Sequence, residues 1–224
     1  AWKDGGQAFE YQKDGKRYRF DIATRSATEL PPPPAEKPPR QDPEKKREQP
    51  PRPERPDRGR QYTSAVSPDG KLKAFYRDRN LWLGETNSTN AIAITTDGNE
   101  RTRVKCGSAN WVYGEELNQA TAIWWSTNST QVAFYRFDES QVKDYYLTLD
   151  HTKIQTRLDV EPYMKAGTTN PVVDILIYDV DSKKTVKVDV RNGKPFDDSV
   201  IGHYLYRVSW TSAGTDLLFH RTNR

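Results

Sequence analysis

The sequence has 224 residues, which is enough for one large domain or for part of a larger repeat architecture. Its net charge of +4 is mostly local, because the stretch 31–60 holds nine Lys/Arg against six Asp/Glu, and the absence of a basic stripe elsewhere argues against nucleic-acid binding. A single cysteine excludes an internal disulfide, no apolar run is long enough to span a membrane, and no signal peptide is visible.

Residues 1–30 have the pattern of a β-hairpin. Aromatic and polar residues alternate in Ala8–Tyr11 and again in Tyr18–Ile22, on either side of an Asp14-Gly15 turn. Alternation with a period of two favours a half-buried strand, and Asp-Gly is a strong hairpin signal. We therefore expect 1–30 to contribute part of a blade of β-sheet.

The stretch 31–60 changes character. It holds eleven of the fifteen prolines, with charged residues between them, and such a composition cannot form strand ladders or a core. It could be a ligand for a proline-binding partner, but a disordered, solvated insertion between two strands is the interpretation that we favour.

An internal repeat dominates the rest of the chain, 61–224. Ser67–Asp78 recurs as Ser126–Phe137, and a weaker copy is Trp210–Arg221; each copy is a tight turn followed by an apolar strand. Repeated short antiparallel meanders are typical of propeller blades. We predict an all-β fold, a partial β-propeller of four-stranded antiparallel blades. These copies cannot close a ring, and the first residue is Ala, so we expect an incomplete ring within a longer protein.

An arm is expected at about 144–167. Two strands are predicted there, 144–149 and 153–158, in a connection that is too long for a standard blade. The arm could lie on its own propeller or pack against a second subunit.

Two adjacent carboxylates, Glu115 and Glu116, lie between the aromatic-rich runs Asn110–Tyr113 and Ala122–Ser126. Carboxylates are rarely buried unless a cation pairs with them. The residues alone leave two interpretations open, namely two solvated acids in a turn or two acids that face a cation.

Other motifs give weaker signals. Asn87-Ser88-Thr89 and Asn128-Ser129-Thr130 are glycosylation sequons, which matter only in a eukaryotic secretory protein. Cys106 is expected to be a buried small hydrophobe, and we expect neither a metal nor a cofactor, because no cluster has metal-ligand spacing. No Gly-x-Ser-x-Gly elbow is present, and the three histidines are scattered, so the segment lacks a Ser-Asp-His triad.

Several rare residues come in one order that resembles the N-terminal β-propeller of the dipeptidyl peptidase IV family, in the prolyl oligopeptidase class of serine peptidases. The resemblance is dense from about 61 to 224. It rests on Trp111-Val112-Tyr113 with Glu115-Glu116, Trp124-Trp125-Ser126, Ala133-Phe134-Tyr135, Pro162-Tyr163 with Lys165-Ala166-Gly167, Asn170-Pro171, and His203-Tyr204-Leu205 with Val208-Ser209-Trp210.

The resemblance implies a function for the two acids. In the family a pair of propeller glutamates binds the free α-ammonium of a peptide substrate, and Glu115 and Glu116 match that pair, with Trp111 and Tyr113 shaping the strand that presents them. The family also uses a propeller arginine that holds the substrate carbonyl, for which Arg60 is a candidate. Gly114 stands where some members carry a third acid.

The resemblance also implies a parent protein. That parent is a serine-type exopeptidase that removes N-terminal dipeptides, with its triad in an α/β-hydrolase domain outside this segment, and with a periplasmic, secreted or cell-surface location. The partners implied are peptides with a free N-terminus and, through the 144–167 arm, a second copy of the chain. One alternative is a catalytically silent propeller that binds peptides or proteins. Another is an unrelated sensor or scaffold propeller, in which the two acids would lie on the outer face.

Overall fold

A computed structural model describes residues 2–31, 55–197, 199 and 204–223. They form two compact units, the first within 1–52 and the second from 53 onward. Regular structure is almost entirely antiparallel sheet. Within the described ranges, no helix has the length and apolarity that a membrane crossing requires.

The first unit is one four-stranded sheet in the order β1-β2-β3-β4. Its elements are β1 (Trp2–Lys3), the 3-10 turn η1 (Asp4–Gly6), β2 (Ala8–Lys13), β3 (Lys16–Asp21) and β4 (Ser26–Leu30). The predicted hairpin is confirmed, because β2 pairs with β3 and the turn residues Asp14 and Gly15 both have positive φ, 51° and 76°. A two-residue turn with positive φ at both positions has a twist that matches the right-handed twist of the flanking strands.

The second unit holds the remaining elements. They are β5 (Ser64–Val66), β6 (Leu72–Arg77), β7 (Asn80–Glu85), β8 (Ala91–Ala93), β9 (Val104–Cys106), α1 (Trp111–Glu115), β10 (Ile123–Trp125), β11 (Gln131–Asp138), β12 (Asp144–Leu149), β13 (Arg157–Pro162), β14 (Val172–Asp179), β15 (Lys184–Lys187), β16 (Tyr204–Trp210) and β17 (Leu217–Thr222).

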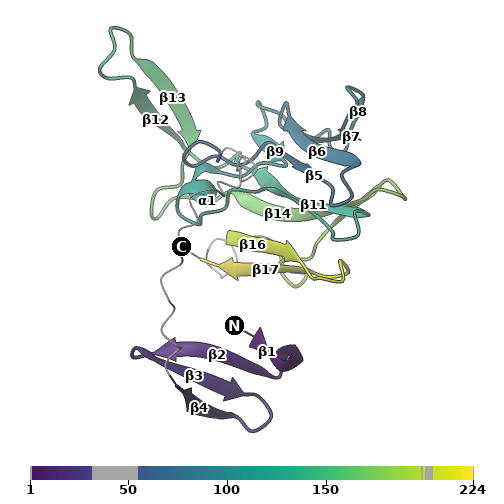
Figure 1. The fold of residues 1–224 in the computed structure, drawn as a ribbon. Helices are drawn as coiled ribbons and strands as arrows, with labels where there is room; N and C mark the ends of the chain where they lie inside the picture. Colours follow the sequence, from purple (N-terminus) through teal and green to yellow (C-terminus); the bar gives the residue numbers. More distant parts are fainter. Residues whose placement is uncertain (1, 32–54, 198, 200–203, 224) are drawn as a thin grey trace, which may run out of the picture. The chain divides into compact units, whose positions relative to one another are not determined.

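Three antiparallel sheets of this unit stack face to face (Figure 1). The first is β5-β6-β7-β8, the second is β10-β11-β14-β15 with β9 also paired to β11, and the third is β16-β17. None of the described sheets closes on itself, so the predicted all-β partial propeller is confirmed. The three repeat copies supply β6, β11 and β17, which places one copy in each sheet.

The strand β11 is buried on both faces, which explains its nearly continuous apolar sequence. Val132 and Phe134 belong to the core shared with the first sheet. Ala133, Tyr135 and Phe137 belong to the core on the other side, together with residues of β16. Because successive side chains of a strand point to opposite faces, one strand can serve two cores.

Tryptophan side chains join neighbouring sheets. The indole Nε1 of Trp125 donates a hydrogen bond of 3.0 Å to the carbonyl of Ala65 in β5. In the same way, Trp210 Nε1 in β16 donates to the carbonyl of Trp124, also at 3.0 Å. Each bond satisfies a partly buried donor while the ring packs between blades, so these rings help to fix the stacking.

The arm forms a separate two-stranded hairpin, β12-β13, that extends away from the stacked sheets (Figure 1). Its first strand is as predicted, but the second runs from Arg157 to Pro162 and not from 153 to 158. Leu149 pairs with Arg157, so the residues between them form a wide turn. The first of these residues, Asp150, has a positive φ of 60°. The apolar residues near 154–158 suggested a strand, but the turn displaces it along the chain.

Most of the predicted insertion, 32–54, lies outside the described residues. Its last six residues, 55–60, are described and belong to the second unit. Gly59 is buried, and a Cβ on it would come within 2.2 Å of Trp111 Nε1, so the backbone packs directly on the indole ring. The folded unit therefore begins before residue 61, the boundary that composition suggested.

Candidate functional site

The residues Trp111–Glu115 form the short helix α1, and not the strand that the resemblance implied. Asn110 caps the helix, because its Oδ1 accepts a hydrogen bond of 2.8 Å from the backbone of Val112. Asn is among the preferred N-cap residues, and the cap outweighs the strand preference of Trp, Val and Tyr over one turn. The same cap was the sequence signal that could have identified the helix.

The side chain of Asn110 also ties α1 to the base of the arm. It is fully buried, and its Nδ2 donates to the carbonyl of Pro162 at 2.6 Å and to Glu139 Oε1 at 3.2 Å. Glu139 is 1% exposed and lies 3.0 Å from Lys105 Nζ. A buried carboxylate requires such partners, so this network holds α1 in a fixed position.

Tyr113 anchors the helix in the core. Its ring meets those of Tyr135 and Phe137 edge-on, with centroids 5.5 and 4.9 Å apart, and its hydroxyl accepts a hydrogen bond of 3.0 Å from the backbone of Leu205. Complete burial raises the pKa of Tyr113 well above its usual value. Tyr113 therefore holds α1 against the core and has no contact with solvent.

Trp111 is half-buried between the 55–60 segment and the arm. Its ring lies 5.8 Å from that of Tyr163, in an edge-on arrangement, and Gly59 packs closely against the indole. Positions 111 and 115 are four residues apart, so both side chains lie on the same face of α1.

The two predicted acids come at the end of α1. Glu115 is its last residue, and Glu116 is the C-cap. Carboxylates at this end gain nothing from the helix dipole, so any stabilisation must come from neighbouring groups. The Glu115 side chain is 23% exposed, whereas Glu116 is exposed and accepts a hydrogen bond of 3.3 Å from the hydroxyl of Tyr163.

Arg58 pairs with Glu115, and sequence reasoning did not identify this residue. Its Nε donates to Glu115 Oε1 at 2.6 Å, and its Nη2 donates to the same oxygen. The hydrogen bond from Arg58 holds the pKa of Glu115 below its usual value, and the same contact raises the pKa of Arg58. The arginine lies in the proline-rich stretch, whose composition gave no reason to expect a folded position.

Glycine at position 114 permits this contact. A Cβ on Gly114 would lie 2.5 Å from the carbonyl carbon of Gly59, so any other residue would push the 55–60 segment away. The segment and Glu115 line a cavity of about 380 Å³, to which Arg58 and Arg60 also contribute.

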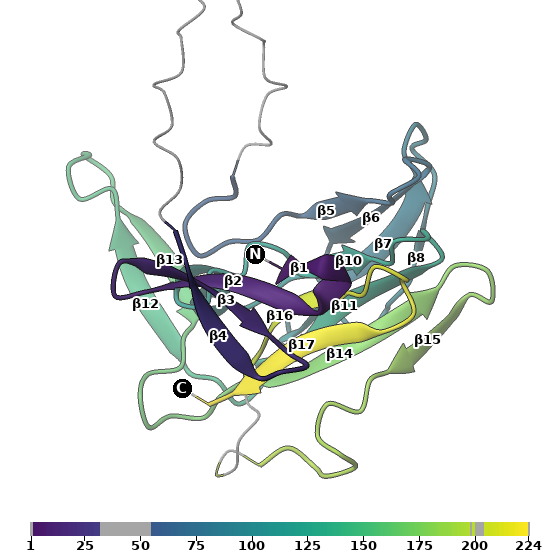
Figure 2. The same ribbon diagram turned by 60° about the horizontal axis from the view of Figure 1, so that its bottom comes forward.

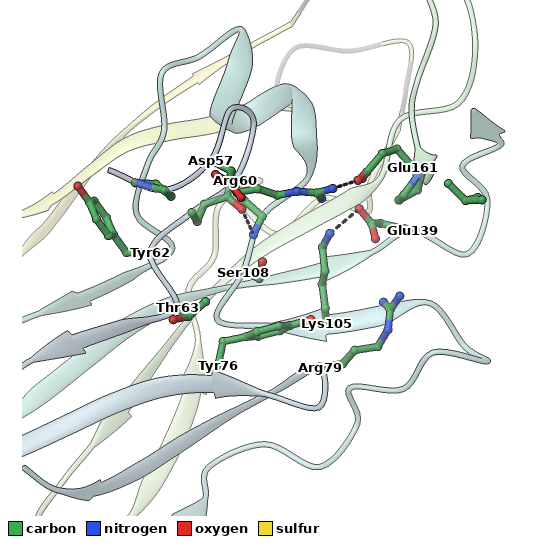
Figure 3. Close-up of a pocket in the computed structure, with 15 residues that line it drawn as sticks. Asp57, Arg60, Tyr62, Thr63, Tyr76, Arg79, Lys105, Ser108, Glu139 and Glu161 are labelled. Atoms are coloured by element: carbon green, nitrogen blue, oxygen red, sulfur yellow. Dashed lines mark hydrogen bonds and ion pairs between the residues drawn. The ribbon is translucent and has the colours of Figure 1, made fainter. Parts of the chain in front are cut away.

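Arg60 points toward the arm and not toward the acids. In Figure 3 its guanidinium meets Glu161, and Lys105 meets Glu139, across a neighbouring cavity of about 600 Å³. Arg60 Nη2 also lies 3.6 Å from Asp159 Oδ2. Arg60 therefore lines both cavities, whereas Glu115 lines only the smaller one.

The remaining candidate residues have structural surroundings. Cys106 is buried in β9, and burial raises the pKa of its thiol to about 12, which makes a reactive thiolate unfavourable. His151 and His220 are exposed, and His203 lies outside the described residues. Among the residues described, no group of three or more His, Cys, Asp or Glu is arranged to hold a metal ion.

The family model described as the dipeptidyl peptidase IV (DPP IV) N-terminal region matches residues 6–224. A protein named probable dipeptidyl-aminopeptidase B from Aspergillus oryzae is 32% identical over 228 residues, which cover 96% of this chain and 22% of the relative. A protein of the same name from Coccidioides posadasii (strain C735) is 36% identical over 184 residues, covering 77% of this chain and 19% of the relative. The chain thus spans about a fifth of these relatives.

A solved structure shares the fold. The crystal structure of dipeptidyl peptidase 4 from Porphyromonas gingivalis matches with a TM-score of 0.60 and 23% identity, covering 100% of this chain and 29% of that one. At this level of identity the similarity bears on the fold alone.

Proposed function

Because the chain belongs to the family of dipeptidyl peptidase IV N-terminal regions, we propose that it is the N-terminal propeller of a serine dipeptidyl peptidase that removes dipeptides from peptides with a free N-terminus. In this proposal Glu115 and Glu116 bind the substrate's α-ammonium. The observation that carries it is the position of both acids at the end of α1, with Glu115 in the wall of a cavity.

The chemistry of an ammonium group supports this role. An ammonium removed from water must recover its lost hydrogen bonds, and carboxylates provide charge-assisted ones. Two acids at a fixed distance from the nucleophile select for the distance between the substrate's free N-terminus and the scissile bond. Only a peptide whose free N-terminus lies two residues from that bond can contact the acids and the nucleophile together. The acids position the substrate and take no part in bond cleavage.

Arg58 is the proposed arginine for the substrate carbonyl, in place of the candidate Arg60. Arg58 touches Glu115 directly, whereas Arg60 is engaged by Glu161 and Asp159 of the arm. A guanidinium has five donors in a planar fork, so one that bonds a carboxylate can still donate to a carbonyl. Arg58 is also 80% exposed and can adjust to a ligand.

The bond chemistry is proposed to lie in an α/β-hydrolase domain of the parent protein, with its own Ser-Asp-His triad. We further propose a periplasmic, secreted or cell-surface location, and a homodimer contact through the arm. Exposed apolar residues support the arm contact, since Tyr146, Leu158 and Val160 are 63%, 61% and 45% exposed. Apolar residues gathered on one projecting hairpin are typical of a protein contact.

The test is the double variant Glu115→Ala, Glu116→Ala in the full-length enzyme. Loss of two charge-assisted hydrogen bonds should lower kcat/KM for an unblocked dipeptide substrate by about 10²-fold or more. The matched control is Glu85→Ala, which removes an exposed glutamate at the end of β7. Dipeptide release that stays unchanged in the double variant would rule out the assignment.

The alternative of a silent peptide-binding propeller predicts the same pair of acids. The two are separated by the parent sequence, which must contain Gly-x-Ser-x-Gly followed by Asp and then His if it is a hydrolase of this kind.

A further inference from the structure

The turn that joins β6 to β7 places an arginine where glycine is favoured. Its two residues, Asp78 and Arg79, have positive φ values of 51° and 62°. The two-residue turn of the first unit is Asp14-Gly15, with φ values of 51° and 76°. Glycine adopts the second of these conformations without strain, whereas a residue with a Cβ does not. Strain of this kind is concentrated where side chains contact ligands.

The guanidinium of Arg79 also has a buried donor without a partner. Among the described residues, nothing accepts a hydrogen bond from its Nη1. Arg191 Nε is in the same position, but the other nitrogens of that guanidinium donate to Asp174 and to the carbonyl of Val173. A buried donor that is left unsatisfied costs free energy. Arg79 therefore destabilises the folded chain through both its backbone and its side chain, and a ligand at Nη1 would offset this.

Arg79 lines the larger cavity, whose volume of about 600 Å³ lies within the range of small-ligand pockets. The lining also includes Tyr76 of β6, Lys105 of β9 and Glu161 of β13. In both Figure 1 and Figure 2 the first sheet and the arm lie on different sides of the second unit. The cavity therefore bridges the first sheet and the arm.

Two of the three cations that line the cavity already have partners. Lys105 Nζ lies 3.0 Å from Glu139, which is 1% exposed. Arg60 pairs with Glu161. The third cation is Arg79, so its charge is the one that an anion in the cavity would meet.

The acids around the cavity limit the charge of that anion. Glu139 and Glu161 belong to the lining, and so does Asp57, which Figure 3 shows beside Arg60 and away from Arg79. A phosphate with two negative charges would be repelled by these carboxylates. A singly charged anion balances the one remaining cation.

A carboxylate fits the donors on this side of the cavity. Its two oxygens lie in a plane and match the parallel N–H donors of a guanidinium. Tyr76 lies on the same side of the cavity as Arg79 in Figure 3. Burial raises the pKa of Tyr76, so its hydroxyl stays protonated at neutral pH and can donate a further hydrogen bond.

We propose that the larger cavity is a subsite for a carboxylate of a bound peptide, held by Arg79 and the hydroxyl of Tyr76. The two cavities share Pro56, Arg60 and Tyr62 in their linings, so a peptide held by its ammonium in the smaller cavity has this subsite beside it. The choice of a peptide rests on the proposed function. The carboxylate is an acidic side chain of a substrate or the new C-terminus of a released dipeptide.

Two matched pairs of compounds test the subsite by isothermal titration calorimetry of the full-length enzyme. Alanyl-alanine and alanyl-alaninol differ in the C-terminal carboxylate. Alanyl-glutamate and alanyl-glutamine, each with an alcohol in place of the C-terminal carboxylate, differ in the side-chain carboxylate. None of the four has a bond for the enzyme to cleave. The carboxylate member of one pair should bind at least about 10-fold more tightly, the factor that one charge-assisted hydrogen bond supplies, and that pair identifies the source.

Variants of Arg79 show whether this residue causes the preference. Arg79→Gln should abolish it, so that the two members of each pair bind alike. Arg79→Gly should do the same with a thermal unfolding midpoint at or above that of wild type, because glycine removes both the strained φ and the buried donor. The matched control is Arg25→Gln, since Arg25 also has a positive φ, 52°, but is exposed in the turn between β3 and β4. It should retain the full preference.

Equal wild-type affinities within both pairs, or a preference that survives Arg79→Gln, would overturn the subsite. The Glu115→Ala, Glu116→Ala variant separates this result from the proposed function. It should weaken the binding of all four compounds but preserve the preference within the pair, because Arg79 is intact. Affinities that do not change in this variant, with the preference still present, would refute the ammonium-binding role and leave the carboxylate subsite in place.

Discussion

The contact between Arg58 and Glu115 is the residue-scale feature that most shapes the candidate site. The guanidinium holds the pKa of Glu115 below its usual value. A lowered pKa keeps the carboxylate ionised to a lower pH, so binding of an ammonium group persists there and is lost as the pH falls through the lowered value. Arg58 therefore extends the acidic range in which Glu115 can act.

Arg58→Gln tests this effect. Removal of the cation should raise the pKa of Glu115, so the acid limb of the kcat/KM profile should move to higher pH. Since Arg58 is also proposed to hold the substrate carbonyl, the pH-independent plateau of kcat/KM should fall as well. The profile of kcat/KM reports the free enzyme, which is the state described by the structure.

The control for this measurement is Arg101→Gln, an exposed arginine in the turn that precedes β9. It should leave the acid limb in place. An Arg58→Gln profile whose acid limb coincides with that of the wild type would show that the ion pair does not tune Glu115.

At the scale of elements, α1 depends on a buried polar network. Lys105, Glu139, Asn110 and the carbonyl of Pro162 connect β9, the end of β11, the helix cap and the base of the arm. Removal of one partner from a buried ion pair leaves an uncompensated charge, which is more harmful than the loss of the pair itself.

Lys105→Met should therefore destabilise the fold by about 3–5 kcal/mol, because Glu139 would be left buried and charged. The double variant Lys105→Met, Glu139→Gln should recover part of this loss. Lys71→Met is the matched control, since Lys71 Nζ lies 3.6 Å from an exposed Asp69 and surface pairs contribute little. Thermal unfolding of the full-length protein measures the stability of the three variants. Equal losses of stability in Lys105→Met and Lys71→Met would contradict a stabilising role for the buried network.

The arm carries a prediction of its own. If β12 and β13 contact a second subunit, Leu158→Asp should convert a dimer to a monomer in light scattering, because it places a charge in an apolar contact. Val186→Asp on β15 is the control, since Val186 is similarly exposed, at 59%, but lies outside the arm. A wild-type monomer, or a dimer that survives Leu158→Asp, would argue against this role.

At the scale of the whole molecule, the sequence predicted the sheets better than the site. Period-two alternation and the turn at Asp14-Gly15 correctly located β2 and β3, because these signals are local. The helix α1 was missed, because Trp, Val and Tyr favour strands. A single helical turn of these residues forms only where an N-cap and a buried anchor outweigh that preference. Arg58 could not be found, because its position depends on the close approach of Gly59 to Gly114.

The positions of Glu115 and Glu116 illustrate the same limit. Their adjacency is visible in the sequence, but the pairing of Glu115 with Arg58 joins residues that are 57 positions apart. Contacts of this kind come from the stacking of blades and from segments that cross between them. They are a property of the tertiary fold and leave no periodic signal in the chain.

The central claim is that the two acids recognise a charged amine, and a substrate comparison tests it most directly. In the full-length enzyme, kcat/KM is measured for a dipeptide substrate and for its analogue without the amino group, with wild type and with the Glu115→Ala, Glu116→Ala variant. The account predicts that removing the amine greatly reduces kcat/KM for the wild type and has little effect on the variant. Equal reductions in both enzymes would contradict it.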